Sequence, residues 1–474
     1  MKQKCHPFLL ALVVLVLASL ACQSLASPEP AATQEPGQPV PQEPSPTETS
    51  SQPAVEPATI DSKGAGILCA GSTTGLSCLT GSGWQIYTDE NSDLPNPYLY
   101  AGAVCPDGQI AIAHINGAVL FDGATFKPIP ETDAVSSPEG IACDANGNIW
   151  VAHFQGVSRY ADGQWITYGS DKLASGESAN ELVYDVEVAS DGKVWVVTSR
   201  SVAMFENETW TVFQEGQGFG GSRFFNALAV DAKGRPWAAH SAGLDVFENG
   251  AWTFIEKTDY SSPESLAVDA RGQVWFGTLI DGAYLYNGNS WTHHDRASGN
   301  VLSDDIASIS ADSSGRVWMG TSYGLTVFDG ANWQTFLMSN SGLSDNDIEF
   351  VLVTNDGPAL PALEEKAKGS LTGKLETESG APVADAAVEI CVETLASTFS
   401  GDTPCSDQPF FLSTKTDANG VFLIENVPAG YYVIVAETGD GSWAQLTDQF
   451  GISSEKTLIQ AGEQYDIETL TLDE

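Results

Sequence analysis

Short apolar stretches, bounded by glycine, aspartate and asparagine, recur along the middle of the chain. In residues 305–336, four such stretches are separated by turns at 312–315, 322–324 and 329–330. Apolar residues alternate within the stretches, and tight turns separate them, which is typical of antiparallel hairpins. Each such unit is therefore predicted to form four short antiparallel strands.

This unit occurs seven times between residues 67 and 356. An aromatic residue marks the same late position in every copy, at intervals of 39 to 45 residues: Trp84, Phe126, Trp165, Trp210, Trp252, Trp291 and Trp333. A four-stranded blade of a β-propeller has this length. We expect these aromatic side chains to fill the wedge between adjacent blades.

The two ends of the repeat region predict how the ring closes. The first copy lacks a clear first strand, whereas residues 347–357 match the first strand of the other copies. Placed beside the first copy, this segment supplies the missing strand and leaves no exposed sheet edge. The sequence thus predicts an all-β chain, with a seven-bladed β-propeller at 60–357 that is closed by a C-terminal strand.

The copies resemble the two-component regulator propeller repeat. The match is best at 317–330, where Val-Trp-Met-Gly-Thr is followed by Gly-Leu and by Phe-Asp-Gly. In that family the propellers form the extracellular sensing part of histidine kinases and bind a ligand, often a carbohydrate fragment. No kinase, transmembrane helix or receiver follows here, so the resemblance implies a binding head without the signalling role.

The sequence changes character after a linker at 358–368. Residues 369–474 resemble the carboxypeptidase regulatory-like, or transthyretin-like, β-sandwich. The matching segments include a hairpin turn at 417–420 and a bend at 428–430. The resemblance implies a small non-catalytic module. No histidine follows His294, and no zinc peptidase domain accompanies the module.

The N-terminus has the pattern of an export signal, with two lysines before an apolar run at 8–20. Cys22 follows in the context Leu-Ala-Ser-Leu-Ala-Cys, which resembles a bacterial lipobox and implies a lipid on this cysteine. The next residues are rich in Pro, Glu, Ser and Thr, a composition that stays extended. We expect a signal peptide at 1–21 and a lipidated, disordered stalk at 22–59. The protein would be a secreted, cell-envelope lipoprotein that faces the extracellular or periplasmic side.

The net charge of −42 and the pI of about 4.1 restrict the partners. Nucleic acid and anionic membrane surfaces would both be repelled. We therefore expect attachment to the bacterial membrane only through the lipid on Cys22, no nucleic-acid partner, and a small-molecule, glycan or protein ligand. The sequence indicates a monomer and no cofactor. No Cys-x-x-Cys spacing occurs, so no metal site is expected.

Six cysteines remain after the signal peptide and Cys22: Cys69, Cys78, Cys105, Cys143, Cys391 and Cys405. An even number in an exported protein favours disulfides. The first two are expected to face each other across neighbouring strands of the first blade, and the last two to bracket a loop of the sandwich. The middle two fall near the ends of neighbouring innermost strands, where a bridge needs Cα atoms within about 7 Å. This third pairing stays open.

The second strand of every copy ends in a hydroxyl or imidazole side chain: Ser72, His114, His153, Thr198, His240, Thr278 and Thr321. Such a ring suggests a metal or catalytic site. However, adjacent sheets pack about 10 Å apart, whereas zinc ligands converge within about 2 Å of one ion. We favour the alternative that each is a buried polar side chain bonded to a neighbouring loop.

The ligand is expected at the mouth of the central channel, formed by the loops entering each innermost strand and the turns after each second strand. The candidate contacts are His114, His153, His240, Tyr184, Phe224, Phe225 and Tyr323. The leading hypothesis is a non-catalytic, surface-anchored binding or sensing protein, with a carbohydrate or another small molecule as ligand.

Two other classes of function stay open. Streptogramin lyases share the seven-bladed shape, and in such an enzyme His153 or His240 would act as general base. The third class is a structural or protein-interaction module with the sandwich as spacer. No nucleophile elbow, phosphate loop or His-Glu-x-x-His motif occurs. No catalytic residue is assigned, and a binding protein is favoured over an enzyme.

Overall fold

A computed structural model describes residues 66–472, except 116, 131–134, 136, 175–180, 215–218, 220–223, 258–259, 393–402, 407, 439–441 and 446–455. The expected signal peptide, the lipidated Cys22 and the stalk lie outside the described residues. Across the described ranges, no helix is long and apolar enough to cross a membrane.

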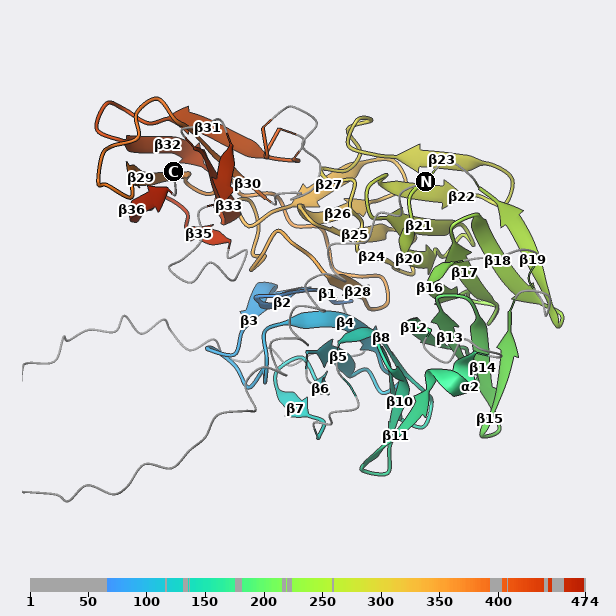
Figure 1. Cartoon of the computed structure of the whole chain (residues 1–474). Coiled ribbons are helices and arrows are strands. Elements are labelled where there is room, and N and C mark those ends of the chain that lie inside the picture. Colours follow the sequence, from blue (N-terminus) through green and yellow to red (C-terminus); the bar gives the residue numbers. More distant parts are fainter. Residues whose placement is uncertain are drawn as a thin grey trace, which may run out of the picture. The chain divides into compact units, whose positions relative to one another are not determined.

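Most of the described chain forms seven four-stranded antiparallel sheets, which we call blades 1 to 7 (Figure 1). From the innermost to the outermost strand, blades 1 to 3 are β28 (Phe350–Val353), β1 (Leu68–Ser72), β2 (Gly75–Thr80) and β3 (Gly83–Tyr87); β4 (Leu99–Val104), β5 (Ile110–His114), β6 (Gly117–Phe121) and β7 (Phe126–Pro128); and β8 (Pro138–Cys143), β9 (Ile149–His153), β10 (Gly156–Ala161) and β11 (Gln164–Gly169).

Blades 4 to 7 repeat this order. They are β12 (Val183–Val188), β13 (Val194–Thr198), β14 (Val202–Glu206) and β15 (Thr209–Phe213); β16 (Phe225–Val230), β17 (Pro236–His240), β18 (Gly243–Glu248) and β19 (Ala251–Glu256); β20 (Pro263–Val268), β21 (Val274–Thr278), β22 (Ala283–Tyr286) and β23 (Trp291–His294); and β24 (Ser308–Ala311), β25 (Val317–Thr321), β26 (Gly324–Phe328) and β27 (Trp333–Phe336). The short helix α2 (Ser170–Leu173) follows β11.

The innermost strands make this set of sheets a ring. In the order β28, β4, β8, β12, β16, β20 and β24, each innermost strand contacts the next, and β24 contacts β28 again. The all-β class and the propeller architecture expected from the sequence are therefore confirmed. We call the end of the ring where each innermost strand begins the top face and the opposite end the bottom face. Because neighbouring strands are antiparallel, the hairpin between the second and third strands of each blade also lies at the top face.

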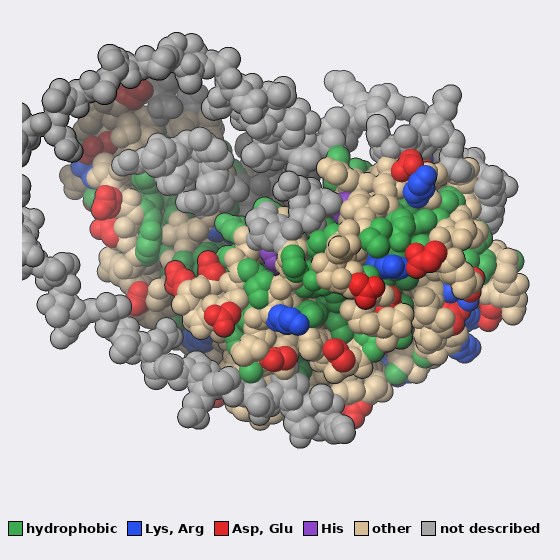
Figure 2. All heavy atoms as spheres, turned by 90° about the horizontal axis from the view of Figure 1, so that it is seen from below, with side chains coloured by type: hydrophobic (Ala, Val, Ile, Leu, Met, Phe, Trp, Pro, Cys, Tyr) green, Lys and Arg blue, Asp and Glu red, His purple; other side chains and the backbone are tan. Residues whose placement is uncertain are grey.

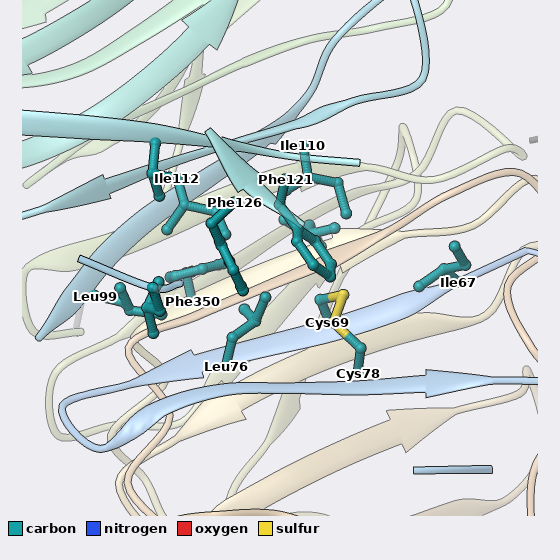
Figure 3. Close-up of a cluster of buried hydrophobic side chains, with 13 residues drawn as sticks. Ile67, Cys69, Leu76, Cys78, Leu99, Ile110, Ile112, Phe121, Phe126 and Phe350 are labelled. Atoms are coloured by element: carbon teal, nitrogen blue, oxygen red, sulfur yellow. A yellow bond between two sulfur atoms is a disulfide. The ribbon is translucent and has the colours of Figure 1, made fainter. Parts of the chain in front are cut away.

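The C-terminal strand closes the ring as expected. β28 pairs antiparallel with β1, and Phe350 lies opposite Gly71. The Phe350 side chain is 4% exposed and belongs to the apolar cluster that joins blades 1 and 2 (Figure 3). It fills the space left by two glycines, since a Cβ at Gly71 or Gly102 would meet its ring at 2.0 or 2.4 Å. The chain ends are thus held by a continuous core rather than by backbone pairing alone.

The repeated outer aromatic residues pack against the neighbouring blade. Ring centroids lie 5.8 Å apart for Trp84 and Phe336, and 6.0 Å apart for Trp252 and Trp195. Each of these contacts joins two blades. The expected wedge-filling role is therefore borne out at these positions, and large aromatic side chains supply much of the buried apolar surface.

A tryptophan in the second strand of several blades is hydrogen-bonded to a repeated aspartate. In four blades, an aspartate at the turn between the first and second strands accepts a hydrogen bond from a tryptophan Nε1–H six residues later, at 3.2 to 3.4 Å: Asp144 with Trp150, Asp231 with Trp237, Asp269 with Trp275, and Asp312 with Trp318. In blade 4 the corresponding residues are Ala189 and Trp195. The Trp195 Nε1 is buried and has no hydrogen-bond partner.

Ala189→Asp is expected to stabilise the protein by about 1 kcal/mol, because the new carboxylate would accept from the Trp195 Nε1–H. The measurement is the free energy of unfolding in urea. Asp269→Ala is the matched control and should lower that free energy by about 1–3 kcal/mol, since it leaves the Trp275 N–H without an acceptor. If Ala189→Asp destabilises the protein, the repeat does not predict the geometry of blade 4.

The C-terminal part contains two small sheets that share one apolar core, which includes Leu371, Val388, Phe422 and Ile434. One sheet has the order β32 (Val421–Val427), β29 (Gly369–Thr377) and β36 (Gln464–Leu472). The other has the order β31 (Phe411–Lys415), β30 (Ala387–Cys391), β33 (Gly430–Glu437) and β34 (Trp443–Gln445), and β35 (Thr457–Ile459) also pairs with β33. This is the β-sandwich expected after the propeller.

Three disulfides occur among the described residues. Cys69 is bonded to Cys78 and Cys391 to Cys405, as the sequence suggested. Cys105 is also bonded to Cys143, with a Cα–Cα distance of 5.0 Å. This third bridge joins blades 2 and 3, a pairing that the spacing had left open.

Candidate binding site

The innermost strands enclose a cavity of about 360 Å³, to which all seven blades contribute lining residues. Its lining contains five carboxylates: Glu139, Asp185, Glu187, Glu264 and Glu349. Two tyrosines, an asparagine and several serines complete the polar part. No Lys, Arg or His side chain is among the described residues of this lining.

A repeated backbone irregularity turns several of these side chains into the cavity. In blades 2 to 6, the register between the first and second strands shifts by one residue at the same place, near the top face. The extra residues are Tyr100, Glu139, Tyr184, Asn226 and Glu264, and every one of them lines the cavity. A β-bulge re-aims the side chain of its extra residue in this way.

Blades 7 and 1 have Ala307 and Glu349 at the corresponding positions, and both residues also line the cavity. The bulge positions therefore form a ring near the top face with carboxylates at Glu139, Glu264 and Glu349. Ala307 leaves one side of this ring without a long side chain.

The carboxylates of the ring hold their protons more tightly than usual. Burial raises the pKa of Glu139 to about 7, and burial together with the charge of Glu139 raises the pKa of Glu264 to about 7. Burial, followed by the charge of Asp347, raises the pKa of Glu349 to about 8. Channel solvent reaches Glu139 and Glu264, which are both exposed, and this limits the rise for these two.

Asp185 and Glu187 lie further down the same side of β12 and have different roles. The Asp185 carboxylate accepts backbone N–H bonds from Val186 at 2.8 Å and from Leu228 of the next blade at 3.0 Å. It therefore ties β12 to β16. Burial raises the pKa of Glu187, and the adjacent Asp185 raises it further. Glu187 is thus a half-buried acid whose ionised form is disfavoured.

The two tyrosines supply donors to the same cavity. Burial raises the pKa of Tyr100 and of Tyr184, so both phenols keep their protons at neutral pH. The cavity therefore presents hydroxyl donors beside carboxylate acceptors. This combination suits a ligand that carries both a positive charge and hydrogen-bonding groups.

Two of the histidine candidates, His153 and His240, are buried and bond within hairpins rather than facing the cavity. His153 is fully buried, its Nδ1 accepts from the Gln155 N–H at 3.3 Å, and its Nε2 lies 2.8 Å from the Ser158 hydroxyl. Burial lowers the pKa of His153 to about 4, so the ring is neutral. His240 is also fully buried, and its Nδ1 accepts from the Ala242 N–H at 3.1 Å.

The same position caps the hairpin in other blades. The Thr198, Thr278 and Thr321 hydroxyls accept from backbone N–H groups two or three residues later. His114 is 2% exposed and is not in the cavity lining. His153, His240 and the three threonines therefore make these contacts within their own hairpins, rather than with a neighbouring loop.

Of the four aromatic candidates, one lines the cavity and three do not. Tyr184 lines the cavity. Phe225 is 1% exposed and packs against Phe219. Phe224 is 52% exposed at the top face, where the guanidinium carbon of Arg200 lies 5.8 Å from its ring centroid. Tyr323 is 5% exposed and outside the cavity lining, so the structure brings only Tyr184 to the cavity.

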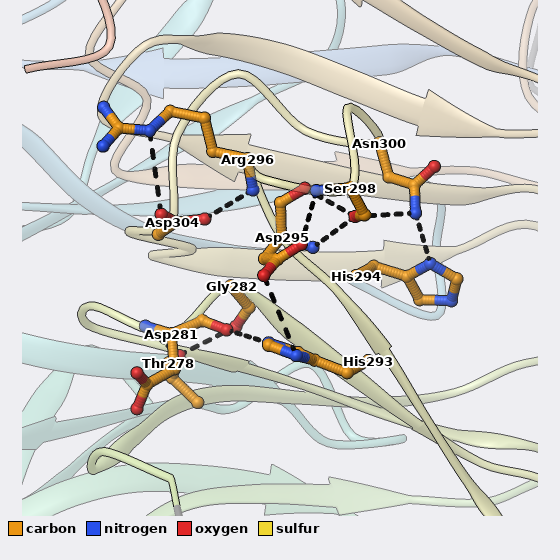
Figure 4. Close-up of polar contacts among 10 residues, drawn as sticks. All are labelled: Thr278, Asp281, Gly282, His293, His294, Asp295, Arg296, Ser298, Asn300 and Asp304. Atoms are coloured by element: carbon orange, nitrogen blue, oxygen red, sulfur yellow. Dashed lines mark hydrogen bonds and ion pairs between the residues drawn. The ribbon is translucent and has the colours of Figure 1, made fainter.

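A polar cluster orders the top face between blades 6 and 7 (Figure 4). The His293 Nε2–H donates to the Asp281 carbonyl, and the Asn300 amide donates to the His294 Nδ1 at 3.0 Å. The Asn300 contact, and the Asp295 carboxylate 3.9 Å from the His293 Nδ1, tie the loop 295–304 to the end of β23. Neither histidine is in the cavity lining. Among the described residues, no group of three or more His, Cys, Asp or Glu side chains could hold a metal ion.

The sequence alone identified Tyr184 but missed the other bulge residues. Its available signal was the recurrence of glutamate at one repeat position, in Ser-Pro-Glu at 137–139 and 262–264 and in Asp-Ile-Glu at 347–349. Acidic residues are so numerous in this chain that this recurrence does not stand out before the copies are aligned on their bulges.

No family model matches the chain, and no curated protein matches it either. Among solved structures, it is similar to virginiamycin B lyase from Staphylococcus aureus, with 14% identity, coverage of 55% of this chain and 92% of that chain, and a TM-score of 0.44. It is also similar to the extracellular domain of the hybrid two-component system BT3049 from B. thetaiotaomicron, with 12% identity, coverage of 85% of this chain and 72% of that chain, and a TM-score of 0.36. A third similar structure is PorZ, a surface component of the type-IX secretion system of Porphyromonas gingivalis, with 14% identity, coverage of 78% of this chain and 62% of that chain, and a TM-score of 0.41. These identities and TM-scores carry no argument about ligand or activity.

Proposed function

We propose that this protein is a surface-anchored, non-catalytic binding protein that holds a small cationic ligand, such as an amine or an amino sugar, in the central channel. The observation that carries the proposal is the ring of bulges, which aims carboxylate, phenol and amide groups into one cavity. Bulges of this kind interrupt the hydrogen-bond ladder and are typical of positions where a side chain has a task.

The charge of the cavity favours a cation over a neutral sugar. Five carboxylates line the cavity, and no basic side chain among its described lining residues balances them. A bound cation would lower the pKa of the ring carboxylates and would be held by charge-assisted hydrogen bonds. The phenols and Asn226 would bind the hydroxyl groups of an amino sugar.

An enzyme of the streptogramin-lyase type is less well supported by the same residues. A general base has to reach its substrate, either directly or through one water molecule. His153 and His240 are fully buried, and their Nδ1 atoms accept backbone N–H groups. Neither has the access that the base would need.

Calorimetric titration with 1,5-diaminopentane, glucosamine, glucose and acetate tests the proposal. We expect the two cations to bind, glucose to bind at least tenfold more weakly, and acetate not to bind. The Glu139→Gln/Glu264→Gln variant should weaken binding of both cations at least tenfold, because it removes two charges of the ring. Glu425→Gln, at an exposed position of β32, is the control and should leave affinity unchanged.

The pH dependence gives an independent check. Cation binding should tighten between pH 6 and pH 8.5, since the pKa values of the ring carboxylates are raised and these groups must lose their protons to hold a cation. The heat of binding should also vary with the ionisation enthalpy of the buffer, which reports the released protons. Equal binding of glucose and glucosamine, unaffected by the double variant, would rule out a cation site.

A further inference from the structure

The top face carries exposed apolar side chains around the mouth of the channel. They lie in two kinds of segment, the loops before innermost strands and the hairpins between second and third strands: Tyr98, Phe224 and Leu302 in the first, and Ile115, Phe154 and Ile280 in the second. These six residues, which we call the apolar rim, are 38% to 62% exposed. They come from blades 2, 3, 5, 6 and 7.

The turns of the bottom face are polar, although Val104 at the bottom end of β4 is 41% exposed. Its described turns between first and second strands contain residues such as Asp107-Gly108, Asp191-Gly192 and Ser314-Gly315. No large apolar side chain in these bottom turns is exposed among the described residues. Figure 2 shows one side of the molecule, where acidic and basic side chains are interspersed among apolar ones. Exposed apolar residues also occur on the outermost strands, as at Ile86, Ile166 and Phe254. The six residues of the apolar rim differ from these because they recur in equivalent segments at one face of five blades.

Two residues of the apolar rim lie just above the ring of bulge residues. Tyr98 precedes Tyr100 by two residues, and Phe224 precedes Asn226 by two residues. At about 3.3 Å per residue of extended chain, the two levels are about 7 Å apart. A lysine or arginine side chain is long enough to pass between them. A ligand that lies on the rim can therefore place a basic group among the ring carboxylates.

We propose that the top face binds a polypeptide segment of a partner protein, with one Lys or Arg side chain inserted into the channel and neighbouring apolar side chains resting on the apolar rim. This inference rests on the proposed cation site and names its ligand class. Apolar contacts around a buried charged anchor are typical of protein interfaces.

The same chemistry disfavours other occupants. An anionic membrane surface would be repelled by the acidic channel and by the net charge of −42. A neutral glycan offers few apolar groups for the aliphatic side chains of Ile115, Ile280 and Leu302. A small amine fits the channel but leaves the apolar rim uncovered. A basic and apolar peptide satisfies both features at once.

Fluorescence anisotropy with short labelled peptides tests this proposal on the full chain. The first probe is a capped peptide, Gly-Leu-Ala-Lys-Ala-Leu-Gly. Two matched peptides replace the lysine by acetyl-lysine or both leucines by serine, and competition with 1,5-diaminopentane reports the channel alone. We expect the first peptide to bind at least tenfold more tightly than either matched peptide and than the diamine.

Two protein variants separate the two levels of the site. Phe224→Ser/Ile280→Ser should weaken the leucine peptide at least fivefold and leave the diamine unchanged, whereas Glu139→Gln/Glu264→Gln should weaken both. Ile166→Ser, at a residue of the outermost strand β11 that is 42% exposed, is the control for a lost apolar side chain and should change neither.

The outcomes distinguish this inference from the proposed function. If the diamine binds but the leucine peptide binds no more tightly than the serine peptide, the partner is not apolar and this inference fails alone. Binding of maltoheptaose or of phosphatidylglycerol vesicles that depends on the rim residues would also overturn it. If neither the diamine nor the peptide binds, the proposed cation site fails as well.

Discussion

Phe350→Ala is expected to lower the free energy of unfolding by about 3–5 kcal/mol, the cost of removing a buried phenylalanine from a packed core. The loss should be at the upper end of this range, because Gly71 and Gly102 flank the ring and offer no side chain to fill the cavity. The same ring also anchors the strand that joins the two ends of the propeller. Urea unfolding followed by tryptophan fluorescence measures the change.

Phe224→Ala is the matched control for this variant. It removes the same side chain from a position that is 52% exposed, so stability should change by no more than about 0.5 kcal/mol. Both variants should unfold with similar dependence on urea concentration if the ring stays closed. A Phe350→Ala variant as stable as Phe224→Ala would contradict the role of the closing strand.

The stability of the protein is expected to fall as the pH rises from about 4.5 to about 8. Burial raises the folded-state pKa of Glu349 to about 8, whereas the ordinary value is 4.5. The pKa values of Glu139 and Glu264 are also raised, but by less, because channel solvent reaches these two side chains. Between these values the folded state binds more protons than the unfolded state, so each increase in pH favours unfolding. Below about pH 4.5 both states are protonated, and above about pH 8 both are ionised, so the effect levels off.

The pKa of Glu187 is raised as well, and Glu187→Gln removes the contribution of this residue to the pH dependence of stability. The amide cannot ionise, so the variant should be more stable than the parent at pH 8 by about 1 kcal/mol or more, given that one pKa unit corresponds to about 1.4 kcal/mol. The difference should disappear towards pH 4.5. Glu425→Gln, which changes the charge by the same amount at an exposed site, should show no such trend. Parallel stability curves for the Glu187→Gln variant and the parent would contradict a raised pKa of Glu187.

The positions of the strands could be predicted from the sequence because every blade repeats the same local chemistry. Alternating apolar residues and Asp-Gly or Asn-Gly turns set hairpins without reference to the rest of the chain. The closing strand was recognisable for the same reason, since 347–357 carries the pattern of a first strand. Cys69 and Cys78 could be paired because one short hairpin determines their register.

The lining of the channel could not be predicted in this way. A one-residue bulge moves a side chain from one side of a strand to the other. The alternation of apolar and polar residues along a strand does not predict where such a bulge occurs. Glu139, Glu264 and Glu349 therefore resemble any other acidic residue of this chain. The histidines misled for the opposite reason. They share a repeat position, but the rings of His153 and His240 bond within their own hairpins, as His153 does with Gln155 and Ser158.

The sequence by itself determined the repeat, the strands, the closure of the ring and the two short-range disulfides, because all of these follow from local patterns or from comparison between copies. Only the tertiary structure decided which side chains meet in the channel, which exposed apolar residues share one face and that Cys105 meets Cys143. These features depend on how neighbouring blades are placed around the ring, and that placement is set by packing between residues far apart in the chain.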